Sequence, residues 1–383
     1  MRMSFGAFAP VRTAWSLAVA GSVGRVGKTR WGVALALAGL VGGAGPGARA
    51  ADGPTLLKRT VMVELHRFER YWPNPKAKEP QYNTYSWVPL VQFEILGPVP
   101  GGSQFVAEFM KADGSPWMSV NLPTEEVGDD IDTVIKMPVP DDSAIEKKGI
   151  TAIGTFPFKI RLKNEVAGKN EVFFSGKYQV TKYPLPRVPA GDKNKTDFCT
   201  VEDWRVPIGF LWLNPKLDEN VPALSAQMWF RGTGSNHVMQ AVLFKDGKQI
   251  DTATGNDEQT LHTPSSDDIN NWELWTFTFI KVRGFNKDTS ANNWEGTYFL
   301  DKNPGDYEIK VLRKDNLART AKFSVGADGK IVDNGVAAQN KLGGIRLVLP
   351  VTVKDTADGK INPLAWKTQA FYGNPLVGFD PTK

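Results

Sequence analysis

Short stretches of the chain alternate between apolar and polar residues with a period of two. The clearest are 91–95 (Val-Gln-Phe-Glu-Ile) and 275–279 (Trp-Thr-Phe-Thr-Phe). Because successive side chains of a β-strand point to opposite faces, this alternation predicts strands with one face in a core and the other toward water. Asp-Gly pairs at 113–114 and 246–247 follow such stretches and are typical of tight hairpin turns. The pattern predicts an all-β protein.

The same order of patterns occurs twice along the chain. Trp-Pro-Asn-Pro-Lys at 72–76 returns as Trp-Leu-Asn-Pro-Lys at 212–216, and an apolar strand, an Asp-Gly hairpin and a closing strand follow each copy. The tryptophans are 212 − 72 = 140 residues apart, whereas the hairpin turns are 246 − 113 = 133 residues apart. A shared order with drifting separation indicates a duplicated unit whose loops differ in length.

A stretch rich in proline and then in polar residues lies between the two copies. Residues 184–197 begin with Pro-Leu-Pro-Arg-Val-Pro, which favours a stiff, extended linker. We therefore expect a first β-domain at 55–183 and a second at 198–326. The remaining residues, 327–383, are expected to form a C-terminal β extension that packs on the second domain.

One apolar strand resembles part of a known fold. Pro304 and Gly305 lead into an alternating stretch that carries Tyr307 near its start, and this resembles the penultimate strand of many bacterial immunoglobulin-like domains. The first copy departs from the pattern, with Phe-Pro-Phe at 156–158. The resemblance implies two tandem β-sandwiches of immunoglobulin-like or fibronectin type. Such a fold does not settle function.

The first 50 residues carry the pattern of an export signal. They contain six basic residues and no acidic one, an apolar run at 31–41, and Ala48-Arg49-Ala50, a small-x-small cleavage sequence. This predicts a signal peptide at 1–50 that is removed on export to the periplasm or the outside of the cell. The apolar run is shorter than the roughly 20 residues of a transmembrane helix. We expect no transmembrane segment in the mature chain.

Removal of this leader changes the charge of the protein. The whole chain has 46 basic and 41 acidic residues, so the mature chain would have 46 − 6 = 40 basic against 41 acidic, a net charge of −1. A nearly neutral protein has no overall attraction to nucleic acid, and we expect no nucleic-acid partner. Cys199 is the single cysteine of the sequence. Without an internal disulfide, the domains must depend on their apolar cores.

Residue types that carry catalysis or bind metals are few and unfavourably spaced. His66, His237 and His262 form no pair at i+2 or i+4, and no stretch has the G-x-S-x-G spacing of a nucleophile elbow. We therefore expect no enzymatic activity, no transition-metal site and no cofactor. Calcium is a weak alternative, because carboxylates on loops can supply its oxygen ligands; the candidates are Asp129, Asp130, Asp132, Asp141, Asp142, Asp267 and Asp268.

Aromatic residues give the remaining signal. Trp275, Phe277 and Phe279 alternate on one strand and are expected in a core. Trp117 and Trp294 lie beside polar, turn-rich residues, where a tryptophan can stack on a sugar or anchor a protein, although it can also cover the end of a core. We interpret the chain as an exported interaction or structural protein that binds a protein or cell-surface partner. The alternative is a pair of carbohydrate-binding modules that use these loop tryptophans.

Overall fold

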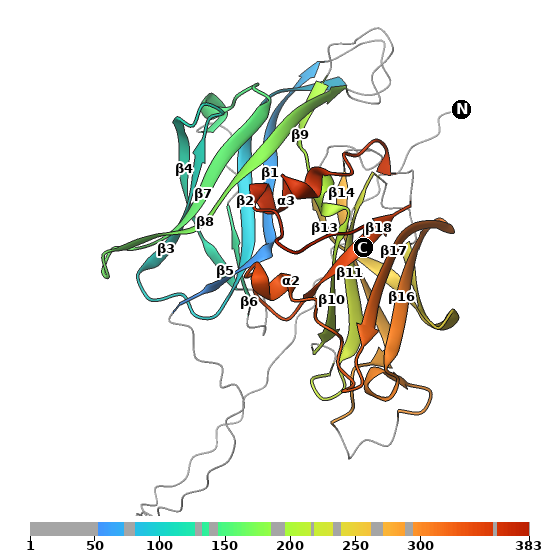
Figure 1. Cartoon of the computed structure of the whole chain (residues 1–383). Helices are drawn as coiled ribbons and strands as arrows, with labels where there is room; N and C mark the ends of the chain where they lie inside the picture. Colours follow the sequence, from blue (N-terminus) through green and yellow to red (C-terminus); the bar gives the residue numbers. More distant parts are fainter. Residues whose placement is uncertain are drawn as a thin grey trace, which may run out of the picture. The chain divides into compact units, whose positions relative to one another are not determined.

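The computed structural model describes much of the chain after the leader. The described ranges are 53–72, 81–126, 132–137, 145–184, 196–215, 218–232, 239–261, 271–287, 294–354 and 358–382. The signal peptide expected at 1–50 lies outside them and stays a prediction. All the described residues belong to one compact unit, 50–383 (Figure 1). No helix within these ranges is long and apolar enough to cross a membrane.

The described chain is all-β, as the alternating patterns predicted. Its helical segments are only three or four residues long, and those used below are η2 (Asp203–Arg205), α2 (Val336–Gln339), η5 (Ala365–Lys367) and α3 (Ala370–Gly373). Strands therefore build both cores, and the short helices only connect or cover them.

The first nine strands form what we call the first body. They are β1 (Thr55–Trp72), β2 (Gln81–Leu96), β3 (Ser103–Met110), β4 (Pro116–Leu122), β5 (Thr124–Glu126), β6 (Asp132–Lys136), β7 (Gly154–Asn164), β8 (Lys169–Pro184) and β9 (Thr196–Thr200). One sheet has the order β1-β2-β6-β5, and the other, a five-strand half-barrel, has the order β4-β3-β7-β8-β9. β9 takes residues that the sequence placed in the linker and at the start of the second domain.

The other nine strands form the second body, which we call the barrel. They are β10 (Ile208–Asn214), β11 (Ala223–Arg231), β12 (Met239–Lys245), β13 (Lys248–Leu261), β14 (Trp272–Arg283), β15 (Tyr298–Phe299), β16 (Gly305–Arg313), β17 (Asn316–Val325) and β18 (Leu347–Val353). Eight of them pair antiparallel in the order β11-β10-β18-β17-β16-β12-β13-β14, and β14 returns to β11, so the sheet closes.

This closure corrects the expectation of two immunoglobulin-like sandwiches. A sandwich keeps two separate sheets. In the barrel, β13 instead joins what would be two sheets, because its first half pairs with β12 and its second half pairs with β14. An eight-strand barrel has an interior that side chains can fill, and here Phe277, Phe279 and Ile309 lie in it with no solvent exposure.

The two bodies repeat one strand order. The order β1-β2-β6 of the first body corresponds to β10-β11-β14 of the barrel. In the same way, β3-β7-β8 corresponds to β12-β16-β17. β4 and β5 are consecutive strands that pair with β3 and β6, as the two halves of β13 pair with β12 and β14. The two Asp-Gly turns join β3 to β4 and β12 to β13. The repeated sequence motifs thus lie at equivalent places in the two pairing orders.

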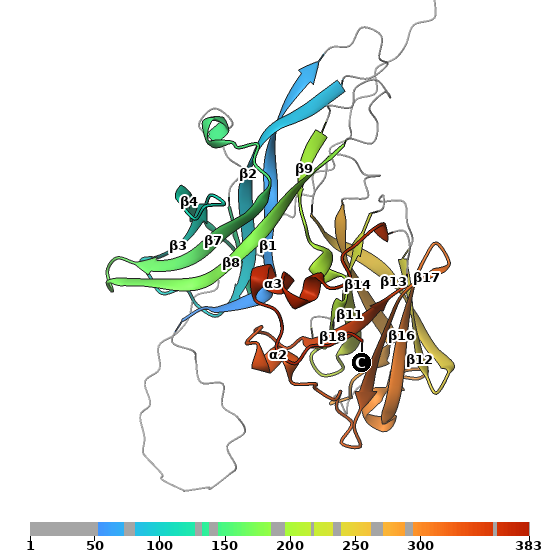
Figure 2. The ribbon, with the colours of Figure 1, turned by 45° about the horizontal axis from the view of Figure 1, so that its top comes forward.

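The bodies differ at the seam where the last strand meets the first. β18 pairs with both β17 and β10 and closes the barrel. β9 pairs with the end of β8, and the described residues contain no ladder from β9 to β1. The C-terminal segment covers this seam (Figure 2): the Val63 N–H of β1 donates to Tyr372 Oη (2.8 Å), and Asn374 Nδ2 donates to the Ser175 carbonyl of β8 (3.0 Å).

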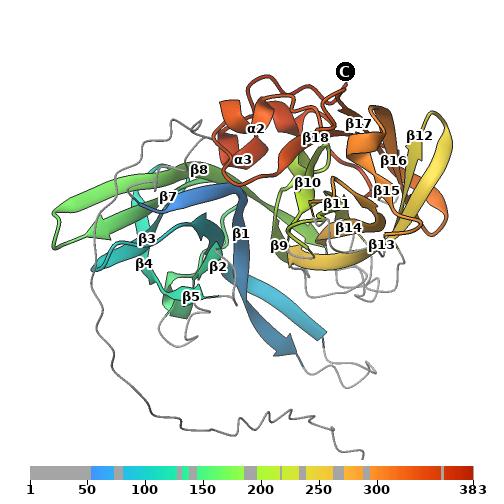
Figure 3. The same ribbon diagram turned by 90° about the horizontal axis from the view of Figure 1, so that it is seen from below.

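The C-terminal residues accordingly divide between the two bodies. β18 completes the barrel, while Trp366, Phe371 and Tyr372 belong to the same cluster of buried side chains as Trp87 and Phe158 of the first body. Seen from below, α2 and α3 lie between β8 and β18 (Figure 3). The extension that the sequence assigned to the second domain alone therefore contributes to both cores.

Candidate functional site at the junction of the two bodies

Trp117, one of the two predicted binding residues, lies at the start of β4 and is partly buried. Its ring packs edge-on against Trp87, with the ring centres 5.5 Å apart, and its Nε1 donates to the Lys148 carbonyl (3.0 Å). Part of its apolar surface is therefore already used in the first core. Its role in binding stays a prediction.

Trp294, the other predicted binding residue, lies beyond β14 on the barrel and is also partly buried. The Arg283 guanidinium lies 5.3 Å from the centre of its ring, and the Trp294 carbonyl accepts a hydrogen bond from the Thr297 N–H in the following turn. Trp117 and Trp294 sit on different bodies, so the fold does not gather them into one site. Binding through Trp294 also stays a prediction.

A buried charge that the sequence analysis missed joins the two bodies. Arg205 on η2 is fully buried, and its Nε donates to Glu202 Oε2 (2.7 Å). Its Nη2 donates to the Val61 carbonyl of β1 (3.2 Å) and to Tyr372 Oη (2.9 Å). Its guanidinium also lies 4.7 Å from the ring of Trp229 on the barrel. This one side chain thus contacts the first body, the barrel and the C-terminal segment.

Burial determines the protonation states of the side chains that surround Arg205. Removal from water raises the pKa of the Glu202 carboxyl, and it also raises the pKa of the Tyr372 hydroxyl. The neighbouring Asp203 carboxyl also has a raised pKa, again chiefly because it is buried. Tyr372 therefore remains a neutral hydroxyl that can accept from Arg205 and from the β1 backbone.

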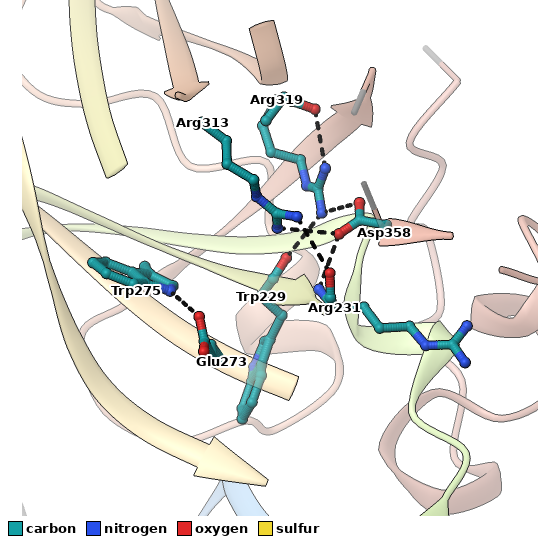
Figure 4. Close-up of polar contacts among 8 residues, drawn as sticks. Trp229, Arg231, Glu273, Trp275, Arg313, Arg319 and Asp358 are labelled. Atoms are coloured by element: carbon teal, nitrogen blue, oxygen red, sulfur yellow. Dashed lines mark hydrogen bonds and ion pairs between the residues drawn. The ribbon is translucent and has the colours of Figure 1, made fainter. Parts of the chain in front are cut away.

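A second buried charge cluster ties the C-terminal segment to the barrel. The Asp358 carboxylate pairs with Arg319 and with Arg313 (3.3 Å), and its Oδ1 accepts from the Arg231 backbone N–H (2.9 Å). Both guanidiniums lie over the ring of Phe230, at 5.1 Å for Arg313 and 4.4 Å for Arg319. Figure 4 shows the two guanidiniums converging on Asp358 while the Arg231 side chain extends away.

A polar cavity lies at the junction of the two bodies. Its volume is 110 Å³, and its lining consists of Arg59, Thr60 and Glu94 from the first body with Phe210, Gln227, Trp229, Leu274 and Arg346 from the barrel side. Arg59 Nη2 lies 3.4 Å from Glu94 Oε2, and Arg346 Nη1 donates to Gln227 Oε1 (2.5 Å). Two guanidiniums, one carboxylate and two aromatic rings therefore surround it.

A larger hollow of 370 Å³ lies on the outside of the barrel, beside the β12–β13 turn. Its lining includes Phe244, Asp246, Tyr307, Glu308 and Lys322. Hydrogen-bonding groups therefore lie next to an aromatic ring in an open depression.

Sequence patterns alone did not predict the junction. Ser225, Gln227 and Trp229 alternate with apolar residues on β11, a pattern that suggests a face toward water. All three are buried, because the first body and the C-terminal segment cover that face. One feature of the sequence could have indicated burial. Trp229 shares its strand face with Ser225 and Gln227, and a tryptophan is unusual on a strand face that is exposed to water.

The structure describes only some of the residues considered for metal or nucleophilic chemistry. His66 packs edge-on against Phe68, and Cys199 is buried in β9. His237, His262 and the acidic pairs considered for calcium lie outside the described residues, as does the side chain of Asp132. Within the described residues, no three His, Cys, Asp or Glu side chains are grouped so that they could hold a metal ion.

Comparison with known proteins adds little. No family model matches the chain, and no curated protein matches it. Among solved structures, it is similar to the crystal structure of S. aureus TarS 217–571, with 11% sequence identity and a TM-score of 0.17. The match covers 49% of this chain and 51% of that chain, about half of each. A similarity this low carries no argument about function.

Proposed function

We propose that the chain is an exported, non-enzymatic interaction or structural protein that binds a protein or cell-surface partner outside the cytoplasm. The observation that carries the proposal is the joint at Arg205. Any relative movement of the bodies that kept this guanidinium buried would take it from its hydrogen-bond partners, which is costly. A joint of this kind holds the loops of both bodies at fixed positions. Such preorganisation lowers the entropy that is lost when an extended partner binds.

Apolar side chains on the outside of the first body support a protein partner. Val166 at the β7–β8 turn is 91% exposed, and Val172 on the same hairpin is 51% exposed. Burial of such surface against a partner contributes roughly 25 cal/mol per Å². We propose that an extended partner contacts this hairpin and Trp117 on the first body and, separately, Trp294 on the barrel.

Photo-crosslinking tests this proposal. A photoreactive amino acid is placed at position 166 or 294 in the exported protein, with position 332 on the barrel as the control, because Val332 is also exposed at 55%. We expect one discrete cross-linked product from positions 166 and 294 that is absent at 332. Identical products from all three positions, or none at any of them, would refute the proposed surface.

A carbohydrate-binding role is the second candidate, and the hollow on the barrel favours it. Asp246, Glu308 and Lys322 can hydrogen-bond sugar hydroxyls there while the Phe244 ring lies alongside. A glycan array with the wild type and a Phe244→Ala variant tests this role. Binding that Phe244→Ala abolishes would favour a glycan ligand, whereas an array without signal from either protein would exclude this candidate.

We also propose that the barrel derives from an immunoglobulin-like unit whose last strand closed the sheet. Tyr307 supports this origin, because its Oη donates to the Asn303 carbonyl four residues upstream (2.5 Å). A tyrosine near the start of a late strand makes a similar contact in immunoglobulin-like domains.

A further inference from the structure

We propose that the cavity at the junction of the two bodies is a binding site for a small carboxylate with a short apolar tail. The cavity is built from both bodies, and sites for small molecules occur preferentially at such junctions. Arg59 and Glu94 come from β1 and β2, whereas Gln227, Trp229 and Leu274 come from β11 and β14. The site is therefore complete only when the two bodies are joined.

An irregularity in β1 directs Arg59 toward the cavity. The ladder between β1 and β2 is regular up to Leu57 and resumes at Met62 with a shifted register. Within the irregularity, Thr60 Oγ1 accepts from the Glu94 N–H (2.8 Å) and donates to the Leu57 carbonyl (2.7 Å). Bulges of this kind often lie next to functional sites, where they change the direction of a side chain.

The Arg346 guanidinium, the second positive group of the cavity, is also positioned by neighbouring side chains. The Arg346 guanidinium lies 4.0 Å from the centre of the Trp212 ring and donates through Nη1 to Gln227 Oε1. Gln227 Nε2 in turn donates to Thr276 Oγ1 on β14 (3.0 Å). A guanidinium packed against a ring, with an oriented amide beside it, is preorganised, so little rotamer entropy is lost when a ligand binds.

The lining defines the chemistry of the ligand. Arg59 and Arg346 supply two positive charges against the single carboxylate of Glu94, so the cavity favours an oxyanion that guanidinium N–H groups can bind. Phe210, Trp229 and Leu274 add a smaller apolar part to the lining, which favours a carboxylate with a short tail over phosphate or sulfate.

The volume limits the size of the ligand. At 110 Å³ the cavity is smaller than the roughly 150 Å³ engineered cavity that accepts benzene. A ligand of about the size of propionate or butyrate matches this volume.

Titration calorimetry with propionate tests the proposal, with propionamide as the uncharged isostere and inorganic phosphate as the alternative oxyanion. We expect saturable binding of propionate, no binding of propionamide and weaker binding of phosphate. Arg59→Gln and Arg346→Gln should each weaken propionate binding by about tenfold or more, as expected for a lost charged hydrogen bond. Arg161→Gln is the matched control, because Arg161 pairs with Glu108 on β3, away from the cavity, and should leave affinity unchanged.

Each other result would overturn the assignment. Equal binding by the wild type and both cavity variants would place the ligand elsewhere, and phosphate bound more tightly than propionate would contradict the ligand class. No saturable binding by the wild type would leave the cavity without the proposed role. If Arg59→Gln fails to fold, Arg346→Lys decides, because it keeps the charge but loses the planar fork and should still weaken binding.

Discussion

At the residue scale, Asp358 is a position where a single substitution should cost much stability. It is a buried carboxylate between the buried guanidiniums of Arg313 and Arg319. Asp358→Ala leaves both charges without this counter-ion, and removal of one partner from a buried ion pair costs about 3–5 kcal/mol. We expect a loss of this size in the free energy of unfolding measured with urea.

Acetate should partly restore the stability of this variant, because it can occupy the space of the missing carboxylate. The control is Asp246→Asn, which removes the charge of an exposed partner of Lys245 but keeps a residue type that tolerates the positive φ of this turn. It should change stability by about 0.5 kcal/mol or less. A loss in Asp358→Ala no larger than in the control would show that the cluster relaxes and readmits water.

Asp203 should make the stability of the protein depend on pH. Burial raises the pKa of its carboxyl above the usual 3.8, and its Oδ2 accepts from the Asn362 N–H (2.7 Å). A raised folded-state pKa adds stability that is fully present below pH 3.8 and is lost as pH rises through the folded value. Asp203→Asn keeps an acceptor but cannot ionise. We therefore expect the variant to gain stability relative to the wild type as pH rises through this window.

Urea titrations of both proteins at several pH values measure this difference. A difference that stays constant with pH would mean that Asp203 has the same pKa in the folded and unfolded chains.

At the element scale, α3 replaces a missing strand ladder, and the Tyr372 hydroxyl makes the replacement contact. Phe371 and Tyr372 both have left-handed backbone angles (φ 46° and 60°), a conformation that costs roughly 1–2 kcal/mol per residue outside glycine. Gly176 of β8 permits the close approach, since a Cβ there would lie 2.8 Å from Tyr372 Cβ. Dense packing at the seam maintains this strained turn.

Tyr372→Phe keeps the ring and removes the acceptor of the Val63 N–H. A buried N–H without a partner costs about 1–3 kcal/mol, so we expect lower stability and faster hydrogen exchange at the Val63 amide. Tyr298→Phe on the barrel is the control, because its hydroxyl contacts Tyr307 and not β1. Unchanged exchange at Val63 would show that α3 does not close the seam.

Local patterns predicted the elements but not how their edges join. The Asp246-Gly247 turn has positive φ at both residues (50° and 74°), as the sequence indicated, and Trp275, Phe277 and Phe279 are buried. Barrel closure was missed, because a sandwich and a barrel share the same alternation along each strand. Pro350 illustrates the difficulty: it suits an inner strand only because β18 pairs with β10 up to this residue and with β17 after it.

The candidate site was harder to predict than the fold. The cavity is lined in part by the polar residues Arg59, Gln227 and Arg346. In the sequence alone, such polar residues indicate a face exposed to water. Their contacts join residues that are more than 100 apart in sequence, as in the pair formed by Arg346 and Gln227, which are separated by 119 residues. No local pattern specifies contacts at such separations.

At the scale of the whole molecule, the two cores share parts of the chain. The cluster around Trp87 includes C-terminal residues such as Phe371, and it includes Phe210 from the outer face of β10. β10 also supplies Leu211 to the barrel core. Neither body can unfold without removing apolar contacts from the other, so we expect one cooperative unfolding unit between residues 53 and 382.

Two matched core variants test this coupling. Phe158 in the first body and Phe277 in the barrel are both almost completely buried phenylalanines, at 1% and 0% exposure, and truncation of such a side chain to alanine costs about 3–5 kcal/mol. If unfolding is cooperative, each variant should accelerate exchange of the slowest amides in β7 and in β16 by the same factor, as read by hydrogen-exchange mass spectrometry. If each variant accelerates exchange only in its own body, the bodies unfold independently. The Arg205 joint then aligns two separately stable bodies without coupling their unfolding.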